Sequence, residues 1–459
     1  MRVIICGAGQ VGYNIAAYLS RENNDITIID NDPDMIARVN EELDVNAIQG
    51  HASIPDVLAA AGAGEADMIA AVTHSDEVNM IACQVAHSLF NVPRKIARIR
   101  DRRYMAPVWA NLFSRAHMPI DVIISPELEV AKAITKRLSV PGTTNVISLA
   151  EGALHFCSVV CETDCPVINT PLRQLAMLFP DINVGILAIY RNGKLRIPEK
   201  EEQMMIGDEV YFVADTNHIE RILSAFGHEE KEARSVVILG GGNIGVCLAQ
   251  ELKEKHKGIN IKIIEKNPRR AIMLSETFTD FIILNGDGLN KTILEEANMQ
   301  ATETLVAVTE DDETNILASI LARQYGCDRT ITLLNKSNYN AILGPLALGT
   351  TVSPRAITSS TIMQYVRRGR IREIHTLLDG EAEVIEVEIS DNTAIVNTPL
   401  KDIHFPKGIL IGAILRKGGE VIIPSGETVM KPQDHVVLFV LAGASAAVEK
   451  IFSVQVDLF

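Results

Sequence analysis

The chain has 459 residues, of which 47% are hydrophobic and 22% charged, and its formal net charge is −15. This composition excludes a disordered chain and is enough for three or four domains of roughly 100–150 residues each. The acidic balance argues against binding to nucleic acid or to anionic lipid, and no apolar run reaches the roughly 18–20 residues that span a bilayer.

The first predicted element is a β-strand at residues 2–6 (RVIIC), which leads directly into a glycine loop and then a helix. A chain that begins with such a strand is expected to have no signal or transit peptide. The loop, GAGQVG, has the G-x-G-x-x-G pattern that opens a Rossmann dinucleotide-binding unit. Asp30 ends the next predicted strand, ITIID. There a carboxylate can accept hydrogen bonds from ribose hydroxyls and would repel the 2′-phosphate of NADP.

The three glycines of this loop are expected to have separate roles. Gly7 allows the tight turn, Gly9 lets a pyrophosphate approach the backbone, and Gly12 lets the helix pack closely on the strand. The phosphates would then lie at the helix N-terminus, where free N–H groups favour negative charge. The alternative is a Rossmann domain that keeps its glycines for packing while its pocket has closed.

Two later strands add candidate ligand contacts. Thr73 ends the apolar strand IAAVT, and Arg98 ends the strand in RKIARIR. Ligands of open parallel sheets lie beyond the carboxyl ends of the strands, so Thr73 and His74 should border the pocket, and Arg98 could reach a phosphate. Thr73 could equally be a helix N-cap, because Ser-Asp-Glu and a helix follow.

The segment after residue 138 has a different pattern, with short strands rich in Val and Ile between turns. A helix at about 216–225 leads into the charged stretch FGHEEKEAR, which we interpret as a linker. The seven cysteines have no zinc spacing and indicate buried, reduced thiols. Cys157, Cys161 and Cys165 are four residues apart, but they lie in a predicted strand and turn, which makes a metal site there an unfavoured alternative.

The chain then repeats itself. Gly240 of GGGNIG matches Gly7 at an offset of 233 residues, and Glu265 matches Asp30. The segment VAVTEDDETNILAS matches AAVTHSDEVNMIAC, which pairs Thr309 with Thr73 and Glu310 with His74. The second, shorter segment is repeated too, because NTPL recurs from Asn397 and the AIYRNGKLRIP hairpin recurs from Ala413. So many ordered matches establish a tandem duplication.

The two halves are not identical at the candidate pockets. Leu334 stands where the first half has Arg98, and Asp287 stands where it has His51. The first pocket should therefore tolerate an anion better, and the two pockets need not bind the same nucleotide.

These patterns predict an α/β chain with two Rossmann-like, doubly wound parallel sheets, each followed by a small α+β module. The predicted domains are a Rossmann nucleotide-binding domain at 1–138, a C-terminal module at 139–225, a linker at 226–234, a second Rossmann domain at 235–366 and a second module at 367–459.

No catalytic pattern accompanies the loops. A dehydrogenase needs a proton donor, usually His, Lys or Tyr, beside the nicotinamide. The histidines of the small modules (His155, His375, His404 and His435) fit no catalytic motif and do not recur between the halves. Motifs of metalloproteases, α/β-hydrolases and P-loop ATPases are also missing. We therefore predict a sensor rather than an enzyme, and we expect the small modules to bind a small ligand or to dimerise.

Taken together, GAGQVG, IIDND, AVTHSDEVNMIACQVAHSLFNVPRKIARIR and the repeated NTPL modules closely resemble the TrkA family of Trk potassium-uptake regulatory proteins, which carry two tandem RCK units. The resemblance covers essentially the whole chain. It implies a cytoplasmic protein that binds NAD(H), or ATP and ADP, in its Rossmann pockets. It also implies a homo-oligomeric ring, attached to the inner face of the membrane through a potassium-translocating subunit of the TrkH/TrkG kind, which the ring gates.

The resemblance also implies the members of both pockets. The first pocket would comprise Gly7, Ala8, Gly9, Gln10, Val11, Asp30, Thr73, His74 and Arg98. The second would comprise Gly240, Gly241, Gly242, Asn243, Ile244, Glu265 and Thr309. Alternatives are a regulator of another cation transporter and an NAD-dependent oxidoreductase, which hydride transfer to a small carbonyl substrate would support.

Overall fold

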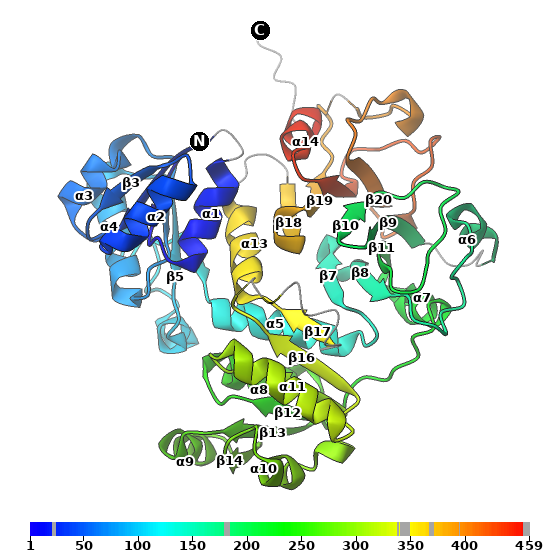
Figure 1. Cartoon of the computed structure of the whole chain (residues 1–459). Helices are drawn as coiled ribbons and strands as arrows, with labels where there is room; N and C mark the ends of the chain where they lie inside the picture. Colours follow the sequence, from blue (N-terminus) through cyan, green and yellow to red (C-terminus); the bar gives the residue numbers. More distant parts are fainter. Residues whose placement is uncertain are drawn as a thin grey trace. The chain divides into compact units, whose positions relative to one another are not determined.

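The computed structural model describes residues 1–20, 24–178, 184–336, 339, 349–366, 371–393 and 395–452 (Figure 1). The chain forms two compact units. The first comprises Met1–Glu129 and Pro354–Arg367, and the second comprises Val130–Ser353 and Arg368–Phe459. Each unit contains one six-stranded sheet.

The sheet of the first unit is parallel and has the strand order β3-β2-β1-β4-β5-β6, which is the order of a dinucleotide-binding Rossmann fold. Apart from Arg2, its two central strands are apolar, as expected when helices cover both faces. The strands are β1 (Arg2–Cys6), β2 (Asp25–Asp30), β3 (Asn46–Gln49), β4 (Met68–Ala71), β5 (Arg94–Arg98) and β6 (Val122–Ile124). The connecting helices are α1 (Gln10–Ser20), α2 (Pro33–Glu42), α3 (Pro55–Ala60) and α4 (Asp76–Phe90).

The second unit contains the repeated sheet, with the equivalent order β14-β13-β12-β15-β16-β17. Its strands are β12 (Ser235–Leu239), β13 (Asn260–Glu265), β14 (Ile282–Asn285), β15 (Thr304–Ala307), β16 (Arg329–Leu333) and β17 (Thr350–Val352). Its helices are α8 (Asn243–Lys255), α9 (Pro268–Thr277), α10 (Lys291–Glu296) and α11 (Asp312–Gln324). Helix α5 (Pro126–Ser139) follows β6 and leads into the first small module.

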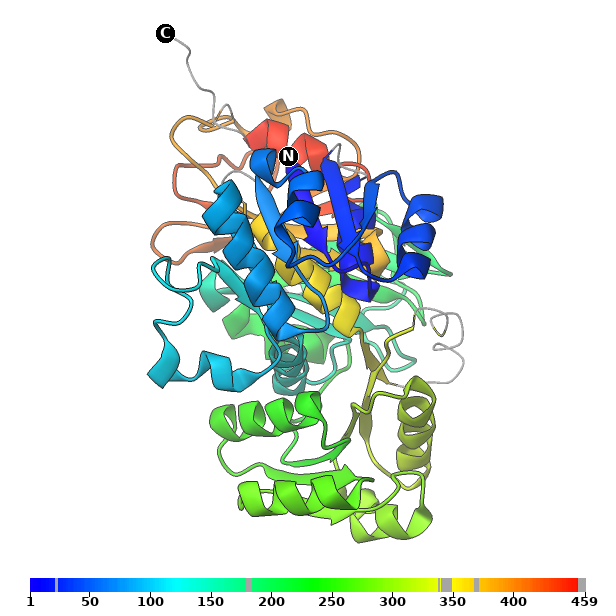
Figure 2. The same ribbon diagram turned by 90° about the vertical axis from the view of Figure 1, so that its left-hand side faces the viewer.

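One helix of the second half of the chain packs in the first Rossmann domain. Helix α13 (Pro354–Val366) follows β17 in the chain, yet it belongs to the first unit and packs against α1 and β6 there (Figures 1 and 2). Ile362 is fully buried in the core that contains Ile5 and Ile15. The second half of the sequence therefore completes the first Rossmann domain.

The two small modules are antiparallel five-stranded sheets of the same topology, β7-β8-β11-β9-β10 and β18-β19-β22-β20-β21. The strands of the first are β7 (Asn145–Leu149), β8 (Leu154–Val160), β9 (Val184–Arg191), β10 (Lys194–Arg196) and β11 (Glu209–Asp215). The strands of the second are β18 (Ile371–Leu377), β19 (Ala382–Glu388), β20 (Ile409–Leu415), β21 (Val421–Ile422) and β22 (His435–Leu441). Their helices are α6 (Leu172–Leu178), α7 (Ile219–Ala225) and α14 (Ser445–Phe452).

The two small modules share one apolar core. Phe156 and Leu187 of the first module are buried in the same cluster as Val384 and Phe439 of the second. Backbones approach closely at Gly185, where an added Cβ would lie 2.7 Å from the carbonyl oxygen of Gly412. The predicted fold class, two Rossmann sheets each with a small α+β module, is confirmed.

Among the described residues, no helix combines the length and the apolar character needed to cross a membrane.

Candidate nucleotide sites

The first glycine loop is as crowded as its pattern predicts. Gly7 has a φ of +107°, which only glycine adopts readily. A Cβ on Gly12 would lie 1.8 Å from the carbonyl oxygen of Gly7, so α1 can approach the strand only at a glycine. A Cβ on Gly9 would meet nothing within 4 Å. The space above Gly9 is therefore open on the side where a ligand would approach.

Asp30 is tied to this loop through its carboxylate. Oδ2 accepts a hydrogen bond from the Ala8 N–H at 2.6 Å, and Oδ1 accepts one from the Asp32 N–H at 2.9 Å. Two oxygens offer about four lone-pair sites, so the carboxylate can still accept from ribose hydroxyls. Gln10 and Val11 are the first two residues of α1. Their N–H groups lack the carbonyl partners that lie deeper in a helix.

The second loop repeats this geometry. The Gly241 N–H donates to Oε2 of Glu265 at 2.9 Å, and the Asn267 N–H donates to Oε1 at 2.7 Å. Gly240 has a φ of +107°. A Cβ on Gly245 would lie 2.0 Å from the Gly240 carbonyl oxygen, whereas one on Gly242 would meet nothing within 4 Å. Asn243 and Ile244 begin α8.

Thr73 is held by a buried asparagine that the sequence analysis did not single out. Oδ1 of Asn79 accepts from the Thr73 N–H at 2.9 Å and from its hydroxyl at 2.7 Å. The same amide donates to the Arg98 carbonyl at 2.9 Å, so Asn79 links the ends of β4 and β5. The N-cap interpretation of Thr73 is wrong, because Ser75 caps α4 by accepting from the Val78 N–H. The sequence feature that could have revealed this contact is the repeat itself, because Asn79 recurs as Asn315.

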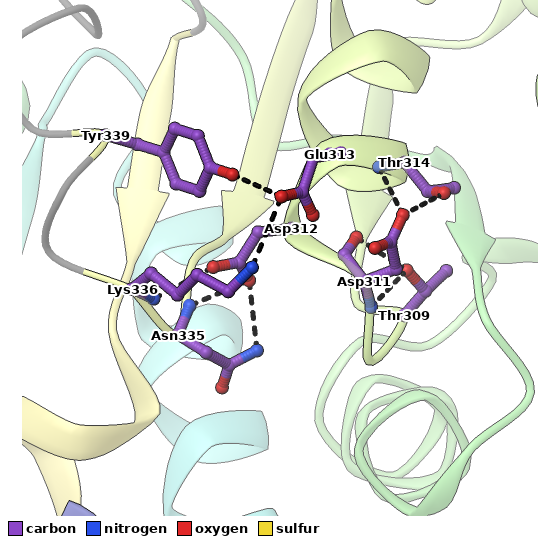
Figure 3. Close-up of polar contacts among 8 residues, drawn as sticks. All are labelled: Thr309, Asp311, Asp312, Glu313, Thr314, Asn335, Lys336 and Tyr339. Carbon is purple, nitrogen blue, oxygen red and sulfur yellow. Dashed lines mark hydrogen bonds and ion pairs between the residues drawn. The ribbon is translucent and has the colours of Figure 1, made fainter.

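In the second half Asn315 holds Thr309 in the same way, and Figure 3 shows further polar contacts around Asp311, Asp312 and Glu313. Oδ1 of Asn315 accepts from the Thr309 N–H at 2.9 Å, and Asp311 is the N-cap of α11. Asp312 is buried and accepts from the backbone N–H groups of Asn335 and Lys336, both at 2.8 Å. These contacts hold Asn335 and Lys336, which lie just after β16.

Arg98 lies at the end of β5, as predicted. Its Nε is buried without a hydrogen-bond partner among the described residues. Burial lowers the pKa of the Arg98 guanidinium below its usual value, and the nearby Arg100 lowers it further. The carboxylates of Glu127 and Asp76 act in the opposite direction. A phosphate that accepts a hydrogen bond from the unpartnered Nε would fit this position.

The second pocket has a cation of its own, which the sequence analysis missed. Nε of Arg270, on α9, donates to the Gly241 carbonyl oxygen at 2.5 Å. The equivalent residue of α2 is Met35. The difference could have been read from the sequence, because the second half has NPRR where the first half has DPDM. Lys266 also pairs with Asp287 at 2.7 Å, which neutralises the charge that distinguished Asp287 from His51. That the first pocket tolerates an anion better therefore stays a prediction.

His74 as a pocket residue stays a prediction. His74 is exposed, and Nδ1 of His51 contacts the Ser53 hydroxyl at 2.8 Å. All seven cysteines are buried and unbridged. No group of three metal-binding side chains occurs in the part of the chain that the structure describes.

Family models match most of the chain. The TrkA-N domain matches residues 3–126 and again 236–354, and the TrkA-C domain matches residues 384–453. The Trk system potassium uptake protein TrkA of Azorhizobium caulinodans is 47% identical over 459 residues, covering all of both chains. The protein of the same name from Halomonas elongata is 38% identical over 463 residues, again covering all of both chains.

Solved structures with the same fold have low sequence identity. The GsuK channel superposes with a TM-score of 0.63 at 17% identity, covering 98% of this chain and 78% of that one. The GsuK channel bound to NAD superposes with a TM-score of 0.60 at 18% identity, covering 98% and 79%. The crystal structure of the GsuK RCK domain gives a TM-score of 0.60 at 17% identity, covering 98% and 95%.

Proposed function

The chain belongs to the TrkA family of potassium-uptake proteins, and we propose that it is the cytoplasmic regulatory subunit that gates a Trk-type membrane subunit in response to nucleotides. The observation that carries the proposal is the duplicated loop. In each half, the carboxylate at the end of the second strand holds the N–H of the residue after the first glycine, and the next glycine faces open space.

The ligands we propose are NAD(H), with ATP or ADP as a second class. The support is the acid at the end of each second strand, which favours an unphosphorylated ribose. A structure described as the GsuK channel bound to NAD shares the fold. The proposed pocket residues are those that the sequence analysis assigned, together with Arg270 in the second pocket.

Gating follows from differential affinity. A nucleotide shifts a ring between two conformations only to the extent that it binds one more tightly than the other. Coupling free energies are typically about 1–3 kcal/mol, so two unlike pockets per chain would allow a ring of such chains to weigh two nucleotide signals. No step in this mechanism needs a proton donor, so we propose that the protein is not an enzyme.

The pocket assignment is tested by titrating NAD, NADH, ATP and ADP against the wild-type chain, Asp30→Ala and Glu265→Ala by calorimetry. Each substitution should weaken at least one nucleotide about ten-fold or more, because it removes a charge-assisted hydrogen-bond acceptor. If neither substitution weakens any nucleotide, the assignment is wrong.

The partner is tested by affinity purification of the tagged chain from solubilised membranes. We expect an integral potassium-uptake subunit of the TrkH/TrkG kind to co-purify, and the chain to elute as a homo-oligomer. Recovery of an antiporter instead would favour the alternative, a regulator of another cation transporter. Purification without any membrane protein would contradict peripheral attachment to the membrane.

A further inference from the structure

We propose that Arg355, which comes from the second half of the chain, is a phosphate-binding residue of the first nucleotide pocket, where it favours nucleotides with a free terminal phosphate. This inference rests on the proposed function, since it adds a residue to a pocket already assigned. It concerns a residue that the repeat pattern places in the other Rossmann domain.

Helix α13 is an integral part of the first unit. Ile362 is fully buried in the core that contains Ile15 of α1 and Ile124 of β6. The helix lies alongside α1 in both views of the molecule (Figures 1 and 2). The position of Arg355 at its start is therefore set by the packing of the first Rossmann domain.

Two hydrogen bonds define the direction of α13. At its start, Nη2 of Arg355 donates to Oδ1 of Asn14 at 3.3 Å. At its end, the Tyr365 carbonyl oxygen accepts from Nη1 of Arg94, the first residue of β5. Because β5 runs from Arg94 to Arg98, the end of α13 lies at the amino edge of the sheet. Its start lies at the carboxyl edge, where ligands of this fold bind.

The Arg355 guanidinium lies close to the glycine loop, because Asn14 belongs to the start of α1. Asn14 lies four residues after Gln10, the first residue of α1, which corresponds to about 6 Å along the helix axis. The guanidinium on Asn14 is therefore about one helical turn from the N-terminus that would hold the phosphates. Arg98 lies at the same edge of the sheet, so two cations from different halves of the chain serve one pocket.

The chemistry of a guanidinium favours a ligand with a free terminal phosphate. A guanidinium binds phosphate oxygens through paired charge-assisted hydrogen bonds. ATP and ADP end in a free phosphate that carries additional charge, whereas each phosphate of NAD is bonded to a ribose on one side and to the other phosphate on the other. Cations beside the first turn of α1 should therefore discriminate in favour of ATP and ADP.

The consequence is a link between the two halves. A nucleotide that binds Arg355 stabilises the docked position of α13, because ligand that binds only the docked form shifts the equilibrium toward it. In the chain, α13 directly follows β17 of the second Rossmann domain. Nucleotide binding in the first pocket would therefore also affect the second Rossmann domain.

The experiment compares Arg355→Gln, Arg355→Lys and Arg94→Gln in the full chain, with ATP and NAD as probes in calorimetry. Arg94→Gln is a matched control, because it removes the hydrogen bond at the other end of α13, away from the pocket. Arg355→Gln should weaken ATP about ten-fold or more and NAD less than about three-fold. Arg355→Lys should recover part of the ATP affinity because it keeps the charge, and Arg94→Gln should change neither.

Equal weakening of ATP and NAD by Arg355→Gln, or equal effects of Arg355→Gln and Arg94→Gln, would show a purely structural role and overturn the inference. So would unchanged ATP affinity in Arg355→Gln when Asp30→Ala does weaken a nucleotide, and the proposed function would then stand. If Asp30→Ala weakens nothing, the pocket itself fails, whatever Arg355 does. Thermal melting of each variant without nucleotide checks that α13 remains docked.

Discussion

The main-chain N–H of Ala150, in the first small module, donates to Oε2 of Glu386, in the second, over 2.7 Å. The Glu386 side chain is only 3% exposed, and its other oxygen lies 2.7 Å from Nδ1 of His435. Ala150 itself has a φ of +50°, a conformation that non-glycine residues rarely adopt. A single buried carboxylate therefore fastens a left-handed turn of one module to the sheet of the other.

Replacing this carboxylate should loosen the contact between the small modules. Glu386→Ala leaves the buried Ala150 N–H without an acceptor, which typically costs about 1–3 kcal/mol. We expect faster hydrogen exchange at Ala150 and a lower unfolding midpoint for the modules. Glu388→Ala, which removes a more exposed carboxylate paired with Arg372, is the control and should have the smaller effect. Unchanged exchange at Ala150 in Glu386→Ala would contradict this prediction.

The glycines of each loop should separate stability from binding. Gly12→Ala places a Cβ 1.8 Å from the Gly7 carbonyl oxygen, so it should destabilise the first unit by about 3 kcal/mol or more. Gly9→Ala meets no atom within 4 Å, so it should leave the melting temperature unchanged and weaken nucleotide binding. Thermal melting and calorimetry measure the two effects. A melting temperature lowered equally by both substitutions would show that the loop is only a packing motif.

Arg270 should contribute to ligand affinity at the second pocket. In an Asp30→Ala background, which disables the first pocket, Arg270→Met reproduces the residue of the first half and should weaken the remaining nucleotide about ten-fold. Arg269→Met is the matched control, because this neighbour on α9 is exposed. Equal losses in the two variants, measured by calorimetry, would point to a general effect of charge instead of a contact.

The Glu313 carboxylate provides a prediction about pH. The hydrogen bond from Tyr339 contributes most to lowering the pKa of Glu313 to about 2, with further help from its own backbone N–H and from Lys336 (Figure 3). Because the folded-state pKa is depressed, the stabilisation is present above the ordinary value of about 4.5 and is lost as the pH falls toward 2.

Tyr339→Phe removes the largest cause, so the pKa of Glu313 should rise toward its ordinary value. A carboxyl-detected NMR titration of Glu313 measures the shift. Lys336→Gln, which removes a pairing at 3.2 Å, should raise the pKa by less. A pKa that stays near 2 in Tyr339→Phe would show that the tyrosine is not the main cause.

Much of the fold follows from local sequence signals. The strand, G-x-G-x-x-G loop and helix, followed by an acid at the end of the next strand, depend on backbone geometry within about 30 residues. For this reason they identify both Rossmann sheets. The tandem repeat also places Thr73 and Thr309 at the sheet edge, and the structure puts each two residues after the end of its strand, held by Asn79 and Asn315.

Charge neutralisation between side chains could not be derived in the same way. Lys266 lies 21 residues before Asp287 in the chain, and only the pairing of β13 with β14 brings them together. Similarly, the side chain of Arg270 could extend into solvent from α9, and its contact with the Gly241 carbonyl depends on where α9 packs.

The sequence by itself determined the duplication, the two glycine loops and their acids, because each is a short-range pattern with a fixed backbone requirement. Only the tertiary structure decided that α13 completes the first Rossmann domain, and hence that Arg355 reaches Asn14. The repeat contains two homologous Rossmann surfaces, and α13 packs against α1 and β6 of the first. Long-range packing decides which of the two surfaces α13 contacts. The periodicity of apolar residues within the helix carries no information about that choice.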